Sequence, residues 1–393
     1  MDIIGLIVVL SLLLIFYAYL GYPLILWCLN EFKPSLPSAN VVSEADAPKS
    51  VSIVITVHNE ARVIREKLEN TLAAAHAFEA LGDDYSVEVI VASDGSTDDT
   101  DTIVSAFAER GVKLVSLPQA SGKEYAQQAA VATVSGDIIV FTDAKVTLDE
   151  QAIVNVSRYF SDKSVGAVSS IDVVDGASSD GSGEGLYVRY EMKLRSLESR
   201  FNSLVGLSGS AFAVRRDVAS EWRTDLPSDF AQLLRAQRMG LRGVHGADVV
   251  CRYKPVATEE EEFSRKVRTV LRGLTAFFSE ISVLNPLEYR TFAWQIFSHK
   301  LCRWLVPPAF IIAFIGSYLL SLGSGFFFLC FLGLFGLSLA ALVGYVHPHQ
   351  RQNKGVKIAL YFMIANMAIL RAWVRYLSGE RTVRWVPSEK GRL

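Results

Sequence analysis

The chain has 393 residues, half of them hydrophobic, and a formal charge of −2 at pH 7. A chain of this length is too long for one ordinary domain, and without a basic excess it gives no reason to expect a nucleic-acid partner. Its four cysteines form no Cys-x-x-Cys motif, which argues against a zinc site or a disulfide framework. The hydrophobic residues are concentrated at the two ends, so we expect a soluble-like middle held by membrane-seeking termini.

The N-terminal run from Ile3 to Leu29 carries no charged side chain. It is long enough to cross the ~30 Å hydrocarbon core of a bilayer. No Lys or Arg precedes the run and no small-residue cleavage site follows it, so an anchor is favoured over a signal peptide. We therefore assign residues 1–30 to a transmembrane anchor and residues 31–50, which contain several prolines, to a linker.

The middle of the chain alternates between strands and helices. Short apolar runs rich in β-branched residues predict strands over 51–57, 87–92, 113–117 and 138–141, with single helices between them. Later strands are expected over 165–174, 211–214 and 248–253. This order predicts an α/β fold with a doubly wound mixed sheet, mostly parallel, and helices on both faces. The domain should extend over residues 51–285.

The helix expected over 186–201 mixes aromatic and aliphatic residues with Arg and Lys. A basic amphipathic helix of this kind suits a membrane surface. The alternative is an ordinary surface helix packed on the core, and the sequence leaves both open.

Residues 286–393 form a C-terminal membrane region that begins with an interfacial helix. Two apolar runs, 305–322 and 326–346, are each long enough to span a bilayer. Basic residues and histidines flank the pair on both sides, which places both flanks in the cytoplasm. The last apolar run, 358–370, is shorter and is more typical of an interfacial helix. We predict three spans in all and a final helix on the cytoplasmic face, with a fourth span as the alternative.

Polar side chains follow three of the predicted strands: His58-Asn59-Glu60, Ser93-Asp94-Gly95-Ser96 and Asp143-Ala144-Lys145. The carboxyl ends of parallel strands meet at one edge of a sheet, so these loops should converge on one crevice. There Asp94 can accept hydrogen bonds from a base or ribose, and Gly95 allows close backbone approach. Alone, the Asp-Gly-Ser run is also typical of a turn before a helix N-cap.

These motifs resemble those of family 2 glycosyltransferases. The likeness rests on residues 52–60 and 89–98, and it continues in the same order through Gly122-Lys123, residues 136–144 and Ser228-Asp229-Phe230. It covers about residues 51–273, and the apolar ends fit membrane-bound members that build surface polysaccharides or glycolipids. The resemblance implies a GT-A fold and a nucleotide-sugar donor.

The resemblance also implies roles for individual residues. Glu60 and Asp94 would hold the nucleoside, and Asp143 would meet the diphosphate, usually through a divalent cation (Mg²⁺ or Mn²⁺). Asp229 resembles the general base of an inverting transferase, since a carboxylate near the acceptor hydroxyl is what such a displacement needs. Its alternative role is an N-cap of the helix that follows. The full set expected to bind the nucleotide sugar is His58, Glu60, Asp94, Lys123, Asp143, Lys145, Arg265 and Arg268.

Arg265 and Arg268 lie at i, i+3 on one expected helix, where they could clamp a diphosphate. The alternative is a basic helix facing anionic lipid headgroups. Processive polysaccharide synthases carry Gln-x-x-Arg-Trp near this point, whereas residues 265–269 read Arg-Lys-Val-Arg-Thr. The missing Gln and Trp argue against processive polymerisation.

Lys145 stands where relatives usually place Asp or Asn. An ammonium has no lone pair to offer a metal. Either a divalent cation is held by Asp143, the diphosphate and waters, which suits Mg²⁺, or Lys145 replaces part of the metal's charge.

From these residues we expect an inverting glycosyltransferase in the cytoplasmic membrane, with its catalytic domain in the cytoplasm. It would move a sugar from a nucleotide sugar, UDP-linked, to a lipid-linked or growing surface glycan, and export or assembly proteins could act beside it. The alternative is a catalytically silent, nucleotide-sugar-binding subunit of a polysaccharide assembly complex.

Overall fold

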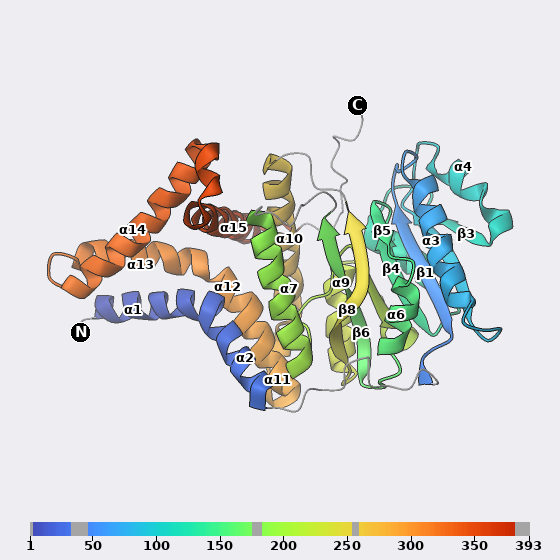
Figure 1. Ribbon diagram of the computed structural model, residues 1–393, viewed down its shortest axis with the longest axis horizontal. Coiled ribbons are helices and arrows are strands. Elements are labelled where there is room, and N and C mark those ends of the chain that lie inside the picture. The colour runs from blue at the N-terminus through green and yellow to red at the C-terminus, as the bar shows by residue number, and fades with distance from the viewer. Residues whose placement is uncertain (1–2, 33–45, 175–182, 254–258, 382–393) are drawn as a thin grey trace.

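A computed structural model describes residues 3–32, 46–174, 183–253 and 259–381. Most of the expected linker at 31–50 lies outside these ranges. An α/β domain forms one end of the molecule and a group of long apolar helices forms the other (Figure 1). The first helices of the chain and the last ones lie together in that second part, as the concentration of hydrophobic residues at the two ends predicted.

The α/β domain is built on one sheet of eight strands in the order β3-β2-β1-β4-β7-β6-β8-β5. The strands are β1 (Ser50–Val57), β2 (Ser86–Ser93), β3 (Val112–Ser116), β4 (Ile138–Asp143), β5 (Val146–Leu148), β6 (Val165–Val174), β7 (Ala211–Arg215) and β8 (Arg242–Tyr253). The half from β3 to β4 is parallel. Beyond it β7 runs antiparallel to both β4 and β6, so the sheet is mixed, as predicted.

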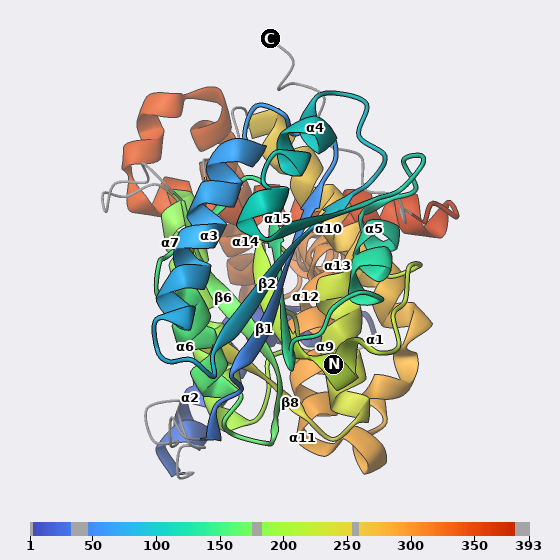
Figure 2. The ribbon, with the colours of Figure 1, turned by 90° about the vertical axis from the view of Figure 1, so that its right-hand side faces the viewer.

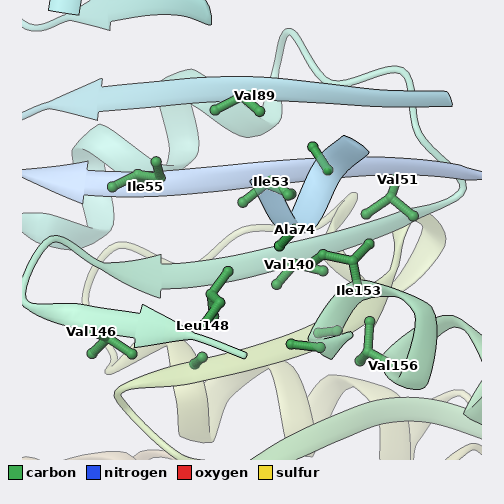
Figure 3. Packing of buried hydrophobic residues seen from close by; sticks show 14 of the residues in the cluster. Val51, Ile53, Ile55, Ala74, Val89, Val140, Val146, Leu148, Ile153 and Val156 are labelled. Atoms are coloured by element: carbon green, nitrogen blue, oxygen red, sulfur yellow. The ribbon is translucent and has the colours of Figure 1, made fainter. Parts of the chain in front are cut away.

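Strand β1 lies in the middle of the parallel half and is buried on both faces. Ile53 and Ile55 point into a core with α3 (Ile64–Glu79) and α6 (Ala152–Tyr159), which Figure 3 shows from close by. Val54 points the other way, into a core with α5 (Lys123–Val131), α8 (Arg216–Ala219) and α9 (Ser228–Arg238). A strand covered on both faces is expected to be apolar throughout, as this one is. A short helix, α4 (Thr100–Ser105), follows β2.

Helix α7 (Gly183–Phe201) connects the sheet to the apolar helices. Its Leu194 and Leu197 are buried against Tyr22 and Leu26 of α2 (Tyr22–Phe32). Arg195 on the same helix is also buried and donates to Ser169 Oγ at 2.6 Å. The structure therefore supports the interpretation of this helix as one packed on the core.

The apolar part contains α1 (Ile3–Phe16), which a π-helical turn joins to α2, and a C-terminal series: α10 (Glu259–Ser279), α11 (Pro286–Ile296), α12 (Cys302–Trp304), α13 (Val306–Leu320), α14 (Gly325–Val346) and α15 (Lys354–Leu377). In the described residues three segments are long and apolar enough to cross a membrane: 3–32, 325–346 and 354–377. A fourth candidate is the bent pair of 286–304 and 306–320, whose two parts meet at 53°.

Two C-terminal helices differ from the sequence-based expectation. Helix α13 has only 15 residues, so the span expected over 305–322 is short unless the preceding helix extends it. Helix α15 has 24 residues, far more than the apolar run that predicted it. Figures 1 and 2 show α15 lying across the direction of α1 and α13, as an interfacial helix would if those two cross the bilayer.

Helices α1 and α13 pack closely because a glycine faces the contact. A Cβ on Gly316 would overlap Val8 of α1, whereas a Cβ on Gly333 of α14 would meet nothing within 4 Å. Small residues at such contacts let apolar helices approach.

We expect Gly316→Leu to force α1 away from α13 and to lower stability by about 1–3 kcal/mol, the usual cost of overpacking. Thermal unfolding in detergent measures the effect. Gly333→Leu is the matched control, with the same change in helix propensity and no neighbour to displace; equal shifts in both variants would contradict the packing described.

Candidate functional site

Three strands deliver their polar ends to one place. Val57 at the end of β1 is paired with Ser93 at the end of β2, and Thr56 is paired with Asp143 at the end of β4. The loops that follow these strands therefore begin side by side at one edge of the sheet. The convergence expected from the sequence is what the registers produce.

The loops after β1 and β2 are joined to each other by hydrogen bonds. Asn59 has a positive φ of 55°, and its side-chain oxygen accepts from Thr97 N at 2.7 Å. The Glu60 backbone N–H donates to Thr100 Oγ1 at 2.9 Å. His58 Nδ1 lies 2.7 Å from the carbonyl oxygen of Asp94. His58, expected to bind the donor, thus fastens the two loops together.

Asp94 is buried and holds the loop that leads into α5. Its carboxylate accepts from the backbone N–H groups of Ser121 at 2.7 Å and Gly122 at 2.9 Å. Gly95 has a φ of 58°, and a Cβ there would overlap the backbone of Gln119. The close approach expected at Gly95 is therefore made by the protein's own chain, and Asp94 holds the loop before α5 in place.

Two lysine–carboxylate pairs lie at the end of β4. Lys123, the first residue of α5, has its Nζ 2.6 Å from Asp143 Oδ1. Lys145 Nζ lies 3.1 Å from Glu60 Oε1. Burial raises the pKa of Glu60, and the charge of Lys145 opposes that rise. Four residues expected in the site are thus brought together as two ion pairs.

A third lysine lies beneath the same turn and was missed from the sequence. Lys67 of α3 is buried and donates to Thr142 Oγ1 at 3.0 Å and to the carbonyl oxygen of Val146 at 2.6 Å. Burial lowers the pKa of its ammonium to about 8. Glu66 beside it is exposed. The helical spacing that places Lys67 on the same face as Ile64, Leu68 and Thr71 is the signal that could have found it.

Asp229 lies on the other side of a glycine from Lys123. A Cβ on Gly209 would be 3.5 Å from Asp229 Oδ2, and the Gly209 carbonyl oxygen is 3.5 Å from Lys123 Nζ. The N-cap residue of α9 is Pro227, and Asp229 Oδ1 accepts from the adjacent N–H of Phe230 at 3.0 Å rather than from a later N–H of the first turn, among the described residues. The N-cap alternative for Asp229 is therefore not what the structure shows, and its carboxylate lies near the ion pairs.

Helix α10 carries several arginines, and one of them, Arg272, contacts the start of α5. Arg272 forms an ion pair with Glu124, a buried carboxylate next to Lys123. Arg265 bonds Glu262 on its own helix at 2.7 Å. Burial lowers the pKa of Arg268, and Arg272 and Arg265 lower it further. Arg272 thus joins α10 to the start of α5, while Arg265 is paired within its own helix, and the clamp of Arg265 and Arg268 stays a prediction.

The donor set fits a metal poorly. Among the described residues, no group of three or more His, Cys, Asp or Glu side chains could hold a metal ion. The Asp143 carboxylate is paired with the ammonium of Lys123. Lys145 stands where the family resemblance leads us to expect Asp or Asn as a second metal ligand. A Mg²⁺ ion can be held by one carboxylate with phosphate oxygens and waters, but at Asp143 it would have to displace the ammonium of Lys123, and Lys145 offers it no lone pair.

Comparison with known proteins gives a consistent result. A family model described as Glycosyl transferase family 2 matches residues 52–223. An N-acetylglucosaminyltransferase of Rhizobium leguminosarum bv. trifolii is 30% identical over 132 residues, which are 33% of this chain and 69% of that protein. An undecaprenyl-phosphate 4-deoxy-4-formamido-L-arabinose transferase of Enterobacter sp. (strain 638) is 35% identical over 106 residues, 26% of this chain and 31% of that protein.

A dolichyl-phosphate beta-glucosyltransferase of Trichomonas vaginalis is 30% identical over 114 residues, 28% of this chain and 33% of that protein. The matches thus span about a third of the length of this relative and of the arabinose transferase. Among solved structures, a mannosyltransferase of Pyrobaculum calidifontis in complex with GDP-mannose and Mn²⁺ has a TM-score of 0.69 at 20% identity, covering 95% of this chain and 99% of that one. This likeness confirms the fold, terminal helices included.

We expect Asp94→Ala to leave two backbone N–H groups without their acceptor and to lower the free energy of unfolding by about 1–3 kcal/mol. Denaturant unfolding in detergent measures the loss. Asp83→Ala, at an exposed position, should change it by less than about 0.5 kcal/mol. An Asp94→Ala protein as stable as this control would show that Asp94 does not hold the loop.

Proposed function

This chain belongs to glycosyl transferase family 2, and from that premise we propose that it is an active, inverting glycosyltransferase. It takes a sugar from a nucleotide sugar, UDP-linked as expected from the sequence, and passes it to a lipid-linked or growing glycan at the membrane. The observation that carries the proposal is the position of Asp229, one glycine away from the Lys123–Asp143 pair.

The proposed reaction uses these residues in distinct roles. Asp229 accepts the proton of the acceptor hydroxyl as its oxygen attacks the anomeric carbon. The bond between that carbon and the diphosphate oxygen breaks, and the electron pair leaves with the nucleoside diphosphate. Lys123 meets the negative charge that develops on the leaving group, because a preorganised cation is worth most where charge appears. The fixed loops after β1 and β2 hold the nucleoside.

The proposed orientation places the α/β domain, residues 51–285, in the cytoplasm and residues 1–30 and 286–393 at the membrane. Of the proposed spans, residues 3–32 and 325–346 are long and apolar enough to cross by themselves, and α13 is so only together with the helix before it. The N-terminus and the connection between α13 and α14 lie at the same end of the molecule, away from the sheet (Figure 1). Basic residues at the opposite ends of these helices support a cytoplasmic location for the catalytic domain.

The acceptor side of the site carries a cation of its own. Lys300 is partly buried, and its Nζ lies 6.0 Å from the ring centroid of Phe230, the neighbour of Asp229. A Cβ on Gly206 would be 3.1 Å from the same Nζ. Lys300 lies between α11 and α13 of the membrane region, so it suits an acceptor with an anionic headgroup. Two relatives are named for transfer to undecaprenyl phosphate and dolichyl phosphate, which supports a lipid-phosphate acceptor here.

We expect Asp229→Asn to lower sugar transfer by about 10²–10⁴-fold, the usual contribution of a general base, while nucleotide binding stays within two-fold, about 0.4 kcal/mol. A panel of UDP- and GDP-sugars, assayed for transfer and for donor hydrolysis, identifies the donor and measures the loss. Glu221→Gln, an exposed carboxylate near the same helix, is the matched control. Equal background turnover in the native protein and Asp229→Asn would favour a catalytically silent subunit.

We expect Lys300→Met to raise the KM for farnesyl phosphate by about ten-fold, corresponding to about 1.4 kcal/mol for one lost charged contact. Lys300→Arg should retain most of the affinity, and donor hydrolysis without acceptor should not change. Farnesol, which lacks the phosphate, is the matched ligand. An unchanged KM for the phosphate in Lys300→Met, or an equal rise with farnesol, would remove Lys300 from the acceptor site.

A further inference from the structure

The carboxylate of Asp143 is surrounded by ammonium groups. Lys123 pairs with it directly at 2.6 Å. Lys145 follows it by two residues and is held at Glu60, 3.1 Å away. Lys67 bonds the residue before Asp143 and the carbonyl oxygen of Val146, and the charge of Asp143 helps to keep Lys67 protonated. The two carboxylates near the end of β4, Asp143 and Glu60, are thus met by three ammonium groups.

The turn that carries these charges is held from below. Lys67 donates hydrogen bonds to Thr142 and Val146, the residues on either side of 143–145, and Ala144 between them is buried. The backbone of Lys145 therefore has a fixed position. Its side chain is 59% exposed, whereas that of Glu60 is only 10% exposed. The ammonium of Lys145 is thus exposed at the end of β4, on a stretch of backbone that Lys67 holds in place.

This arrangement suits an anion better than a divalent cation. A metal ion at Asp143 would lie close to like charges, and Lys145 offers it no lone pair. A diphosphate has oxygens that accept hydrogen bonds from ammonium groups, and opposite charges attract across the same short distances.

We infer that the ammonium groups of Lys123 and Lys145 bind the donor's diphosphate in place of a divalent cation, so that donor binding and transfer need no metal. The inference rests on the proposed function and concerns the same site. On binding, phosphate oxygens take the place of carboxylate partners at the two ammonium groups. During transfer the bond between the anomeric carbon and the diphosphate breaks, its electron pair goes to the leaving oxygen, and the proton goes to Asp229. Neither lysine changes its covalent state.

The first test is binding of UDP and GDP to the full chain in detergent, measured by calorimetry with EDTA and again with Mn²⁺. The nucleotide that binds should show the same Kd within about two-fold in both buffers. A Mn²⁺ titration followed by electron paramagnetic resonance should show no protein-bound ion. Binding that disappears in EDTA and returns with Mn²⁺ overturns the inference and leaves the proposed function standing. Failure of both nucleotides to bind in either buffer overturns both.

The second test changes the charge and then offers a metal ligand. Lys145→Met should weaken the nucleoside diphosphate by ten-fold or more and the corresponding monophosphate by less than three-fold. Lys145→Asn should bind the diphosphate weakly in EDTA and recover affinity with Mn²⁺, because its side-chain oxygen can coordinate a metal. Lys163→Met is the matched control. Lys163 is exposed and lies just before β6, at the opposite end of the strands from the site. A Lys145→Met protein that binds the diphosphate like this control overturns the inference.

Discussion

The alignment of β1 between β2 and β4 is the constraint on which the site depends. Burial of β1 on both faces favours these pairings, because a slip of one residue would exchange the side chains packed in the two cores. With the registers set, the ends of all three strands lie at one edge. The loops proposed to bind the donor therefore begin at fixed positions. The hydrophobic effect in the core thus determines where the polar chemistry takes place.

Ion pairs also hold the loops together at that edge of the sheet. Lys123 with Asp143, Lys145 with Glu60 and Arg272 with Glu124 join four separate segments of the chain. A buried or half-buried charge is costly without a partner, so these pairs hold their loops together before any ligand arrives. Side chains positioned in this way need little rearrangement to meet a diphosphate, which is what preorganised electrostatic stabilisation requires.

A buried polar network fixes the apolar helices relative to the catalytic domain. Tyr22 of α2 donates to Glu198 of α7 at 2.7 Å, and His299 Nδ1 lies 2.7 Å from the same carboxylate oxygen. Arg303 donates to Glu191 of α7 at 2.8 Å. The N-terminal helix, α7 and the entry to α13 are thus joined through one helix. A membrane-bound acceptor would therefore meet Asp229 at a defined depth.

The sequence by itself determined the strands other than β5, the apolar ends and the edge where His58, Asp94 and Asp143 gather, because apolar runs and their periodicity are local features. It also marked Lys145 as a departure from the family pattern. Only the tertiary structure decided which charges pair, that Lys67 is buried beneath the turn, that Arg272 anchors α10 and that β7 reverses the sheet. Each of these depends on segments far apart in the chain, whose meeting is set by packing and register rather than by any local pattern.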